Sequence, residues 1–264
     1  MKILYFTSTG NSLYVARCIG GELLSIPQLI RSGIYTIEDE AVGIVCPTYF
    51  GRVPKIVKRF LQKAVIKTDY LFYIGTYGFA AGYTPTAFAE LVTPLGLHVN
   101  YAQIIKMVDN SLPTFDMDKQ KATAYKKDID GQIARIKADI EARRNNVPKA
   151  GFIDRLGMKL NDALAPKQMA GTIAQQIFMV TDACTLCGTC SRVCPVSNIS
   201  IDGKVMFGDQ CERCYACVQN CPQKALRLKS EANPNARFRN EHVTLADIIK
   251  SNQQSSSSSS IKNN

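Results

Sequence analysis

The sequence predicts an α/β domain built on a doubly wound parallel sheet, followed by a small cysteine-rich domain. In the first half of the chain, short apolar runs rich in β-forming residues alternate with helical patterns, the order that builds parallel sheets covered by helices. In the second half, eight of the ten cysteines fall in two runs of identical spacing. A chain of 264 residues is long enough for one medium domain and one small one.

The first predicted strand, residues 2–7, runs into a small polar loop, and a helical pattern covers residues 13–23. A buried strand, a polar loop and a helix start are typical of a phosphate site, where hydroxyls and the N–H groups of the helix end donate to phosphate oxygens. A glycine in the loop lets the backbone approach closely. The Walker lysine and the GxGxxG pattern are both missing, which disfavours nucleoside triphosphates and dinucleotides. A Ser/Thr cap on a surface turn is the alternative interpretation. The loop consists of Thr7, Ser8, Thr9, Gly10, Asn11 and Ser12.

Further strands are predicted over residues 41–46, 69–74 and 98–108, with a weaker one over 23–26, and helices extend to about residues 66 and 95. Because ligands bind parallel sheets at the carboxyl ends of strands, we expect the loops there to meet at one site. The loop after 41–46 holds Pro47, Thr48, Tyr49, Phe50 and Gly51, and the loop after 69–74 holds Gly75, Thr76, Tyr77, Gly78, Phe79 and Gly82. A helix over 118–146 with an apolar stripe at Tyr125, Ile129, Ile133, Ile136 and Ile140 closes the domain.

These loops resemble the FMN site of flavodoxins. The resemblance implies a flavodoxin-like fold with strand order 2-1-3-4-5, and it implies FMN with its phosphate at residues 7–12. It also implies that Tyr49 or Phe50, with Tyr77 or Phe79, stacks near the flavin; a place in the core is the alternative interpretation for each of these aromatic residues. The backbone around Gly51 and Gly78 would then touch the ring. Residues 27–40 depart from the family because they are too few for a full helix with both its loops, so we expect a single turn or irregular structure there.

Both cysteine runs read C-x2-C-x2-C-x3-C-P, and the step from Cys184 to Cys211 maps every cysteine of the first run onto the second. This is an internal repeat. Three thiolates from one tight loop wrap three corners of a [4Fe–4S] cubane, and the fourth cysteine reaches the other cluster. The spacing predicts one cluster on Cys184, Cys187, Cys190 and Cys221, and a second on Cys211, Cys214, Cys217 and Cys194.

Zinc and disulfides are two disfavoured alternatives for these cysteines. Zinc sites usually use two CxxC pairs rather than triplets followed by Cys-Pro, and disulfides need an oxidising compartment. One redox cluster beside a degraded second site is a further alternative, but no ligand is missing. The pattern resembles the bacterial two-cluster ferredoxin over about residues 177–230. Cys18 and Cys46 lie outside the repeat, and we interpret them as small buried apolar residues.

We expect a flavodoxin-like domain over residues 1–147, a helical connector over 148–176 and an α+β ferredoxin domain over 177–231. The connector is predicted from a stripe at Ile153, Leu156, Leu160 and Leu164. Residues 232–264 contain Asn-Pro, many polar residues and a serine run, so we expect that tail to be mostly disordered.

The net charge of +10 is spread along the chain, and two clusters with FMN would reduce it to about +4. Nucleic-acid binding is therefore disfavoured, and no apolar run predicts a membrane span or a signal peptide. We expect a cytoplasmic protein. The whole pattern resembles flavodoxin–ferredoxin fusion proteins of anaerobic bacteria, which implies an electron carrier acting with redox partner proteins. The alternatives are a flavin-dependent reductase of a small molecule, with Tyr49, Tyr77, Tyr83 and Lys106 lining a pocket, and a redox sensor.

Overall fold

In the computed structural model, which describes residues 1–80, 83–151, 157 and 174–252, five parallel strands form the central sheet. The strand order is β2-β1-β4-β6-β7, which confirms the predicted 2-1-3-4-5 order of a flavodoxin-like sheet. The central strands are continuous apolar runs because helices cover both of their faces. The strands are β1 (Lys2–Tyr5), β2 (Glu22–Ser25), β4 (Ala41–Pro47), β6 (Tyr70–Tyr77) and β7 (Tyr101–Lys106).

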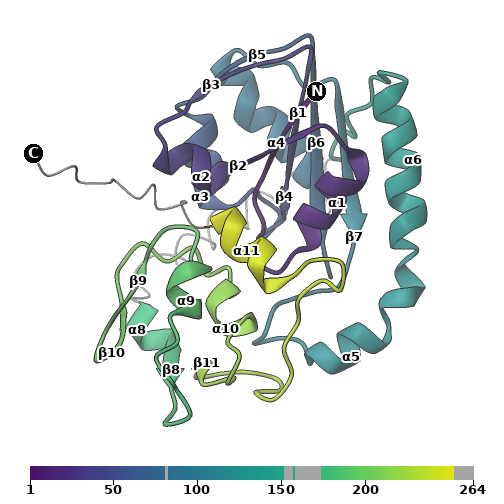
Figure 1. Cartoon of the computed structure of the whole chain (residues 1–264). Helices are drawn as coiled ribbons and strands as arrows, with labels where there is room; N and C mark the ends of the chain where they lie inside the picture. The colour runs from purple at the N-terminus through teal and green to yellow at the C-terminus, as the bar shows by residue number, and fades with distance from the viewer. Residues whose placement is uncertain (81–82, 152–156, 158–173, 253–264) are drawn as a thin grey trace, which may run out of the picture.

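Helices lie on both faces of this sheet (Figure 1). Tyr73 of β6 stacks on Phe88 at a centroid distance of 4.2 Å, whereas the Tyr101 hydroxyl donates to Asp139 at 3.0 Å. Tyr101 is paired with Phe72, and neighbouring strand residues point to opposite faces. Right-handed crossovers accordingly place α1 with α6 on one face and α2, α3 and α4 on the other. These helices are α1 (Asn11–Ile19), α2 (Ile26–Arg31), α3 (Lys55–Leu61), α4 (Thr84–Val92) and α6 (Ile129–Glu141).

In the first part of the sheet domain, the expected elements differ from the observed ones at helix ends and by one extra strand pair. Residues 27–40 hold the short α2 and β3 (Thr36–Glu38), which pairs with β5 (Val65–Lys67) outside the main sheet. The helix expected to reach residue 66 therefore ends at Leu61. The helix expected over 13–23 ends at Ile19, and a 3-10 turn, η1 (Thr93–Leu95), follows α4.

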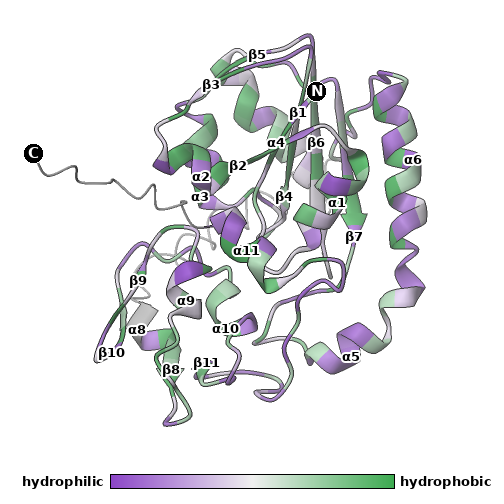
Figure 2. Cartoon of the chain, in the orientation of Figure 1, coloured by the Kyte–Doolittle hydropathy of each residue, from purple (hydrophilic) through white to green (hydrophobic). Residues whose placement is uncertain are grey.

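The helix predicted over 118–146 is three separate pieces, α5 (Met117–Ala122), η2 (Ala124–Lys127) and α6. Asp128, between η2 and α6, adopts a left-handed conformation with φ 47°, which interrupts the helix at that point. The stripe is correct from Ile133 to Ile140, which are buried, but Tyr125 is 78% exposed. Figure 2 shows the sheet strands mostly apolar and α6 mixed in polarity. Among the described helices, none has the length and apolar character to cross a bilayer.

The cysteine domain, elements α8 to β11, shows the internal repeat in its backbone. Helix α9 maps onto α10 by the same step that relates the two cysteine runs, and β8 and β9 map onto β10 and β11. Left-handed residues recur in register as the pairs Leu186 and Arg213, Gly188 and Tyr215, and Ser197 and Lys224. Each strand pairs with one from the other half, β8 with β11 and β9 with β10. The elements are α8 (Ala174–Ile177), β8 (Phe178–Val180), α9 (Thr189–Arg192), β9 (Ile199–Asp202), β10 (Lys204–Phe207), α10 (Ala216–Gln219) and β11 (Leu226–Leu228).

The prediction of a mostly disordered tail is wrong for residues 232–252, called here the C-terminal segment. It runs back from the cysteine domain to the sheet domain and ends in α11 (Leu245–Asn252), which packs against α2 and α9 (Figure 1). Phe238, Val243 and Ile248 are buried, so sparse apolar residues anchor a segment whose polar composition predicts disorder. The predicted stripe of the connector, Ile153, Leu156, Leu160 and Leu164, lies outside the described residues.

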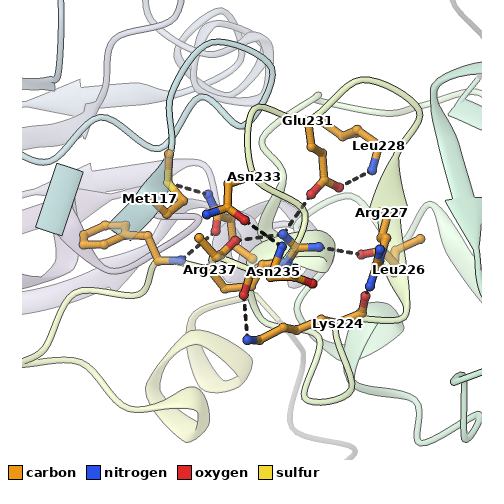
Figure 3. Close-up of polar contacts among 12 residues, drawn as sticks. Met117, Lys224, Leu226, Arg227, Leu228, Glu231, Asn233, Asn235 and Arg237 are labelled. Carbon is orange, nitrogen blue, oxygen red and sulfur yellow. Dashed lines mark hydrogen bonds and ion pairs between the residues drawn. The ribbon is translucent and has the colours of Figure 1, made fainter. Parts of the chain in front are cut away.

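A buried ion pair fastens the start of this segment to the cysteine domain (Figure 3). Arg237 donates to Glu231 at 2.8 Å, and their side chains are 8% and 2% exposed. Glu231 also accepts the backbone N–H of Leu228, at the end of β11, and Arg237 donates to the carbonyl of Leu226. The pair thus joins both ends of a turn to one strand.

We predict that Arg237→Leu lowers the free energy of unfolding by about 3–5 kcal/mol, because it leaves the Glu231 carboxylate buried without a cation. Arg135→Leu is the matched control: its pair with Asp128 has side chains 66% and 67% exposed, so its loss should cost less than about 1 kcal/mol. Anaerobic urea unfolding of the cofactor-loaded protein measures both. Equal losses would contradict a special role for the buried pair.

Candidate functional site

A cavity of about 330 Å³ lies at the carboxyl ends of β1, β4, β6 and β7, within the size range of small-molecule sites. The loop between β1 and α1 forms one wall, and the side chains of Thr7, Ser8, Thr9 and Ser12 are at most 3% exposed. The loop makes its own bonds, since the N–H of Gly10 donates to Thr7 Oγ1 at 3.0 Å. The structure thus presents a buried set of hydroxyls at a cavity wall.

Most of the predicted loop residues meet at this cavity. Gly10, Gly51 and Gly75 are not among its lining residues, and Gly82 lies outside the described residues. Phe50 and Phe79 are 54% and 77% exposed, so they stand towards solvent rather than in the core. The predicted residues that line the cavity are Thr7, Ser8, Thr9, Asn11, Ser12, Pro47, Thr48, Tyr49, Phe50, Thr76, Tyr77, Gly78 and Phe79.

Sequence reasoning missed two further walls. The loop after β7 lines the cavity with residues that include Asp109 and Asn110, and Asn110 donates to Thr9 Oγ1 at 2.8 Å. This loop follows the strand predicted over residues 98–108. The rule that ligands bind at the carboxyl ends of parallel strands was therefore sufficient to find it. The second wall comes from the cysteine domain: Glu212, Arg213, Cys214 and Tyr215. No local pattern indicates that wall, because it depends on how the domains pack.

The eight cysteines of the repeat surround two separate cavities. One is lined by Cys184, Cys187, Cys190 and Cys221, and the other by Cys194, Cys211, Cys214 and Cys217. The structure therefore brings together the two sets expected from the spacing, each completed by the last cysteine of the other run. In the described residues no three such side chains converge closely enough to hold one metal ion. Thiolates at the corners of a cubane lie farther apart than thiolates on a single ion.

The two cysteine cavities differ in exposure. Cys187 of the first set is exposed, whereas Cys194, Cys214 and Cys217 of the second are buried. We call them the outer and the inner cavity. Burial raises the pKa of the Cys214 and Cys217 thiols, while a hydrogen bond with Thr189 lowers the pKa of the Cys187 thiol. Backbone N–H groups also approach the inner sulfurs, with the N–H of Asn198 donating to Cys194 Sγ at 3.2 Å.

Cys214 lines both the inner cavity and the sheet-domain cavity. The pKa of Tyr49 reflects this proximity, since burial and then the charge of Cys214 raise it well above its usual range. The Tyr49 hydroxyl donates to Ser8 Oγ at 3.4 Å. Tyr49 of the sheet domain thus contacts the hydroxyl-lined loop and lines the same cavity as Cys214.

Two buried polar contacts hold this junction together. Glu212 accepts the N–H of Ile56 at 3.1 Å and an Arg59 N–H at 2.7 Å. Burial raises the pKa of the Glu212 carboxyl, and Arg59 opposes that shift. On the other side, Arg31 of α2 donates to the carbonyls of Cys194 and Pro195, each at 3.0 Å. Both contacts join residues beside the inner cysteines to helices α2 and α3 of the sheet domain.

Residues 176–222 match the family model of a 4Fe-4S dicluster domain. With the strand order of the sheet, this match decides the architecture. The chain joins a flavodoxin-like domain to a C-terminal segment that matches the 4Fe-4S dicluster family. A ferredoxin from Pyrobaculum islandicum is 33% identical to the chain over 66 residues, which is 24% of this chain and 62% of that ferredoxin. The chain therefore spans less than two thirds of this relative.

The solved structures that resemble this chain are distant. Rubredoxin oxygen:oxidoreductase from the anaerobe Desulfovibrio gigas is 21% identical with a TM-score of 0.32, over 52% of this chain and 36% of that one. A putative flavoprotein from Bacteroides uniformis is 12% identical with a TM-score of 0.30, over 46% of this chain and 94% of that one. The assignment of the flavodoxin-like domain rests on its own strand order.

We predict that Gly10→Ala destabilises the flavodoxin-like domain more than Gly20→Ala does. Both glycines have positive φ, 101° and 92°, so each alanine incurs backbone strain of about 1–3 kcal/mol. A Cβ at Gly10 would also lie 2.9 Å from Asn240 and Val243, whereas a Cβ at Gly20 meets open space. The difference should be roughly 1–3 kcal/mol in urea unfolding, and equal losses would argue against the close approach.

Proposed function

We propose that this protein carries electrons between FMN in the sheet-domain cavity and two [4Fe–4S] clusters, and exchanges single electrons with redox partner proteins. One observation carries the proposal: Cys214 lines both the inner cysteine cavity and the sheet-domain cavity. Groups bound in the two cavities would share a wall. The order is then FMN, inner cluster, outer cluster.

The lining residues of the sheet-domain cavity fit FMN. The buried hydroxyls of Thr7, Ser8, Thr9 and Ser12, at the start of α1, suit a phosphate that needs several donors. Tyr49, Phe50, Tyr77 and Phe79 supply aromatic surface along the rest of the wall. FMN bound there would accept one or two electrons, whereas each cluster moves one. The protein's residues would bind the phosphate, flank the ring and restrict water.

Both cysteine cavities fit a cubane of four irons. Each is lined by four thiols of the expected spacing. Burial raises the thiol pKa of Cys214 and Cys217, so these groups need a bound cationic core to stay deprotonated. The outer cavity suits exchange with partners, because Cys187 is exposed and Leu186 beside it is 41% exposed.

A second candidate function is reduction of a small molecule at the flavin. It is favoured by Asp109, a carboxyl that lines the same cavity and whose pKa burial raises above its usual value. Such a group can hold a proton next to the flavin. Anaerobic assays with a chemical reductant and candidate acceptors separate the two functions. Turnover of a small molecule without any second protein would replace the carrier proposal with the reductase.

We predict that anaerobically purified protein holds about eight irons per chain and one FMN. Cys194→Ala should remove the inner cluster, lowering the iron content towards about four and abolishing the spectroscopic interaction between flavin and reduced cluster. Cys221→Ala should lower the iron equally but preserve that interaction, because it affects the outer site.

Cys18→Ala is the control, since Cys18 lines neither cysteine cavity and its loss should leave the iron content unchanged. A full iron content in Cys194→Ala would contradict the assigned ligand set. Bound zinc with negligible iron in the native protein would refute the clusters altogether.

A further inference from the structure

The backbone carbonyls of the hydroxyl-lined loop are held by asparagines from outside the sheet domain. Three consecutive carbonyls each accept one hydrogen bond, and all three donors belong to the cysteine domain or the C-terminal segment. We call these donors the asparagine clamp. The bonds run from Asn252 Nδ2 to the Thr7 carbonyl at 3.3 Å, from Asn220 Nδ2 to that of Ser8 at 3.3 Å, and from the Asn240 backbone N–H to that of Thr9 at 2.8 Å.

The clamp contacts the loop from outside the cavity wall. None of its three residues lines the cavity, whereas Thr7, Ser8 and Thr9 do. In a planar trans peptide the C=O group and the following N–H group point in opposite directions, and the described residues contain no cis peptide. Carbonyls fixed towards the clamp therefore turn the N–H groups of Ser8 and Thr9 the other way. These are the donors that an anion in the cavity needs.

The clamp also touches both cysteine runs. Asn220 directly precedes Cys221, and it donates to the Ala216 carbonyl within α10 at 2.9 Å. Asn252 Nδ2 donates to the carbonyl of Val193, next to Cys194, at 3.1 Å. Asn220 and Asn252 are 3% and 0% exposed. The Asn252 amide thus joins the loop to Val193, beside the inner ligand Cys194. The Asn220 amide joins the loop to α10, beside the outer ligand Cys221.

We propose that the asparagine clamp sets the conformation of the phosphate loop, so that the FMN affinity of the sheet domain depends on the cysteine domain and the C-terminal segment. This inference rests on FMN binding as proposed above. Because such coupling is reciprocal, FMN must stabilise the clamp as much as the clamp favours FMN. Loss of the clamp leaves the loop in place but removes the constraint that directs its donors.

Asn252→Asp and Asn220→Asp test the clamp in the full, cluster-loaded chain. Each replaces a donor amide by an oxygen of the same shape that faces carbonyls. We expect the FMN dissociation constant, measured by flavin fluorescence, to rise roughly fivefold to a hundredfold in each variant, since each carbonyl loses a buried bond. Iron content should stay at the native value.

Asn235→Asp is the matched control, because it makes the same substitution at an exposed position of the C-terminal segment. Its FMN dissociation constant should equal that of the native protein. A native-like constant in both clamp variants would overturn the proposal, as would an equal rise in the control.

Hydrogen exchange of the native protein provides an independent readout should a variant fail to fold. FMN should slow amide exchange in α11, although no residue of the C-terminal segment is among those that line the cavity. Unchanged exchange in α11 on FMN binding would overturn the clamp while leaving the proposed function intact. Failure of the native protein to bind FMN at all would instead refute the proposed FMN site.

Discussion

A buried carboxylate of the cysteine domain is bonded to the sheet domain and contributes to holding the two domains together. Glu212 stands between two cysteines of the inner cavity, yet its hydrogen bonds go to the first turn and to Arg59 of α3 in the sheet domain. A buried charge of this kind is tolerated only where its partners are in place. Any displacement of the cysteine domain would separate Glu212 from these partners and leave its charge buried without them. The contact thereby keeps Cys214 at the wall of the sheet-domain cavity, which is the basis of the proposed electron path.

Local sequence patterns were sufficient to predict the central strands and the grouping of the cysteines. The apolar runs at 41–46 and 69–74 predict the central strands because burial on both faces requires continuous apolar residues. The cysteine spacing predicts which thiols gather, since the repeat carries its own turns. Gly10 has a second reason besides the one expected. Its missing side chain makes room for Asn240 and Val243 as well as for the loop's left-handed turn.

Features that depend on contacts between distant segments could not be read from the sequence. Polar composition at 232–252 predicts disorder, but Phe238 and Ile248 find apolar surfaces supplied by other parts of the chain. Tyr125 fits a helical stripe in the sequence, yet the break at Asp128 turns it to solvent. The wall formed by Glu212 and Cys214 has no local signature, because it arises only when the two domains meet.

The internal repeat has an electrochemical consequence. Both cysteine loops share the same pattern of left-handed residues, so two clusters held there would have nearly the same backbone environment. Any difference in their reduction potentials must then come from what surrounds them. The inner site has the cation Arg31 on two of its carbonyls and the carboxylate Glu212 beside it, whereas the outer site has an exposed thiol at Cys187. The sheet domain would thus influence the reduction potential of the inner cluster, whereas exposure to solvent would influence that of the outer cluster.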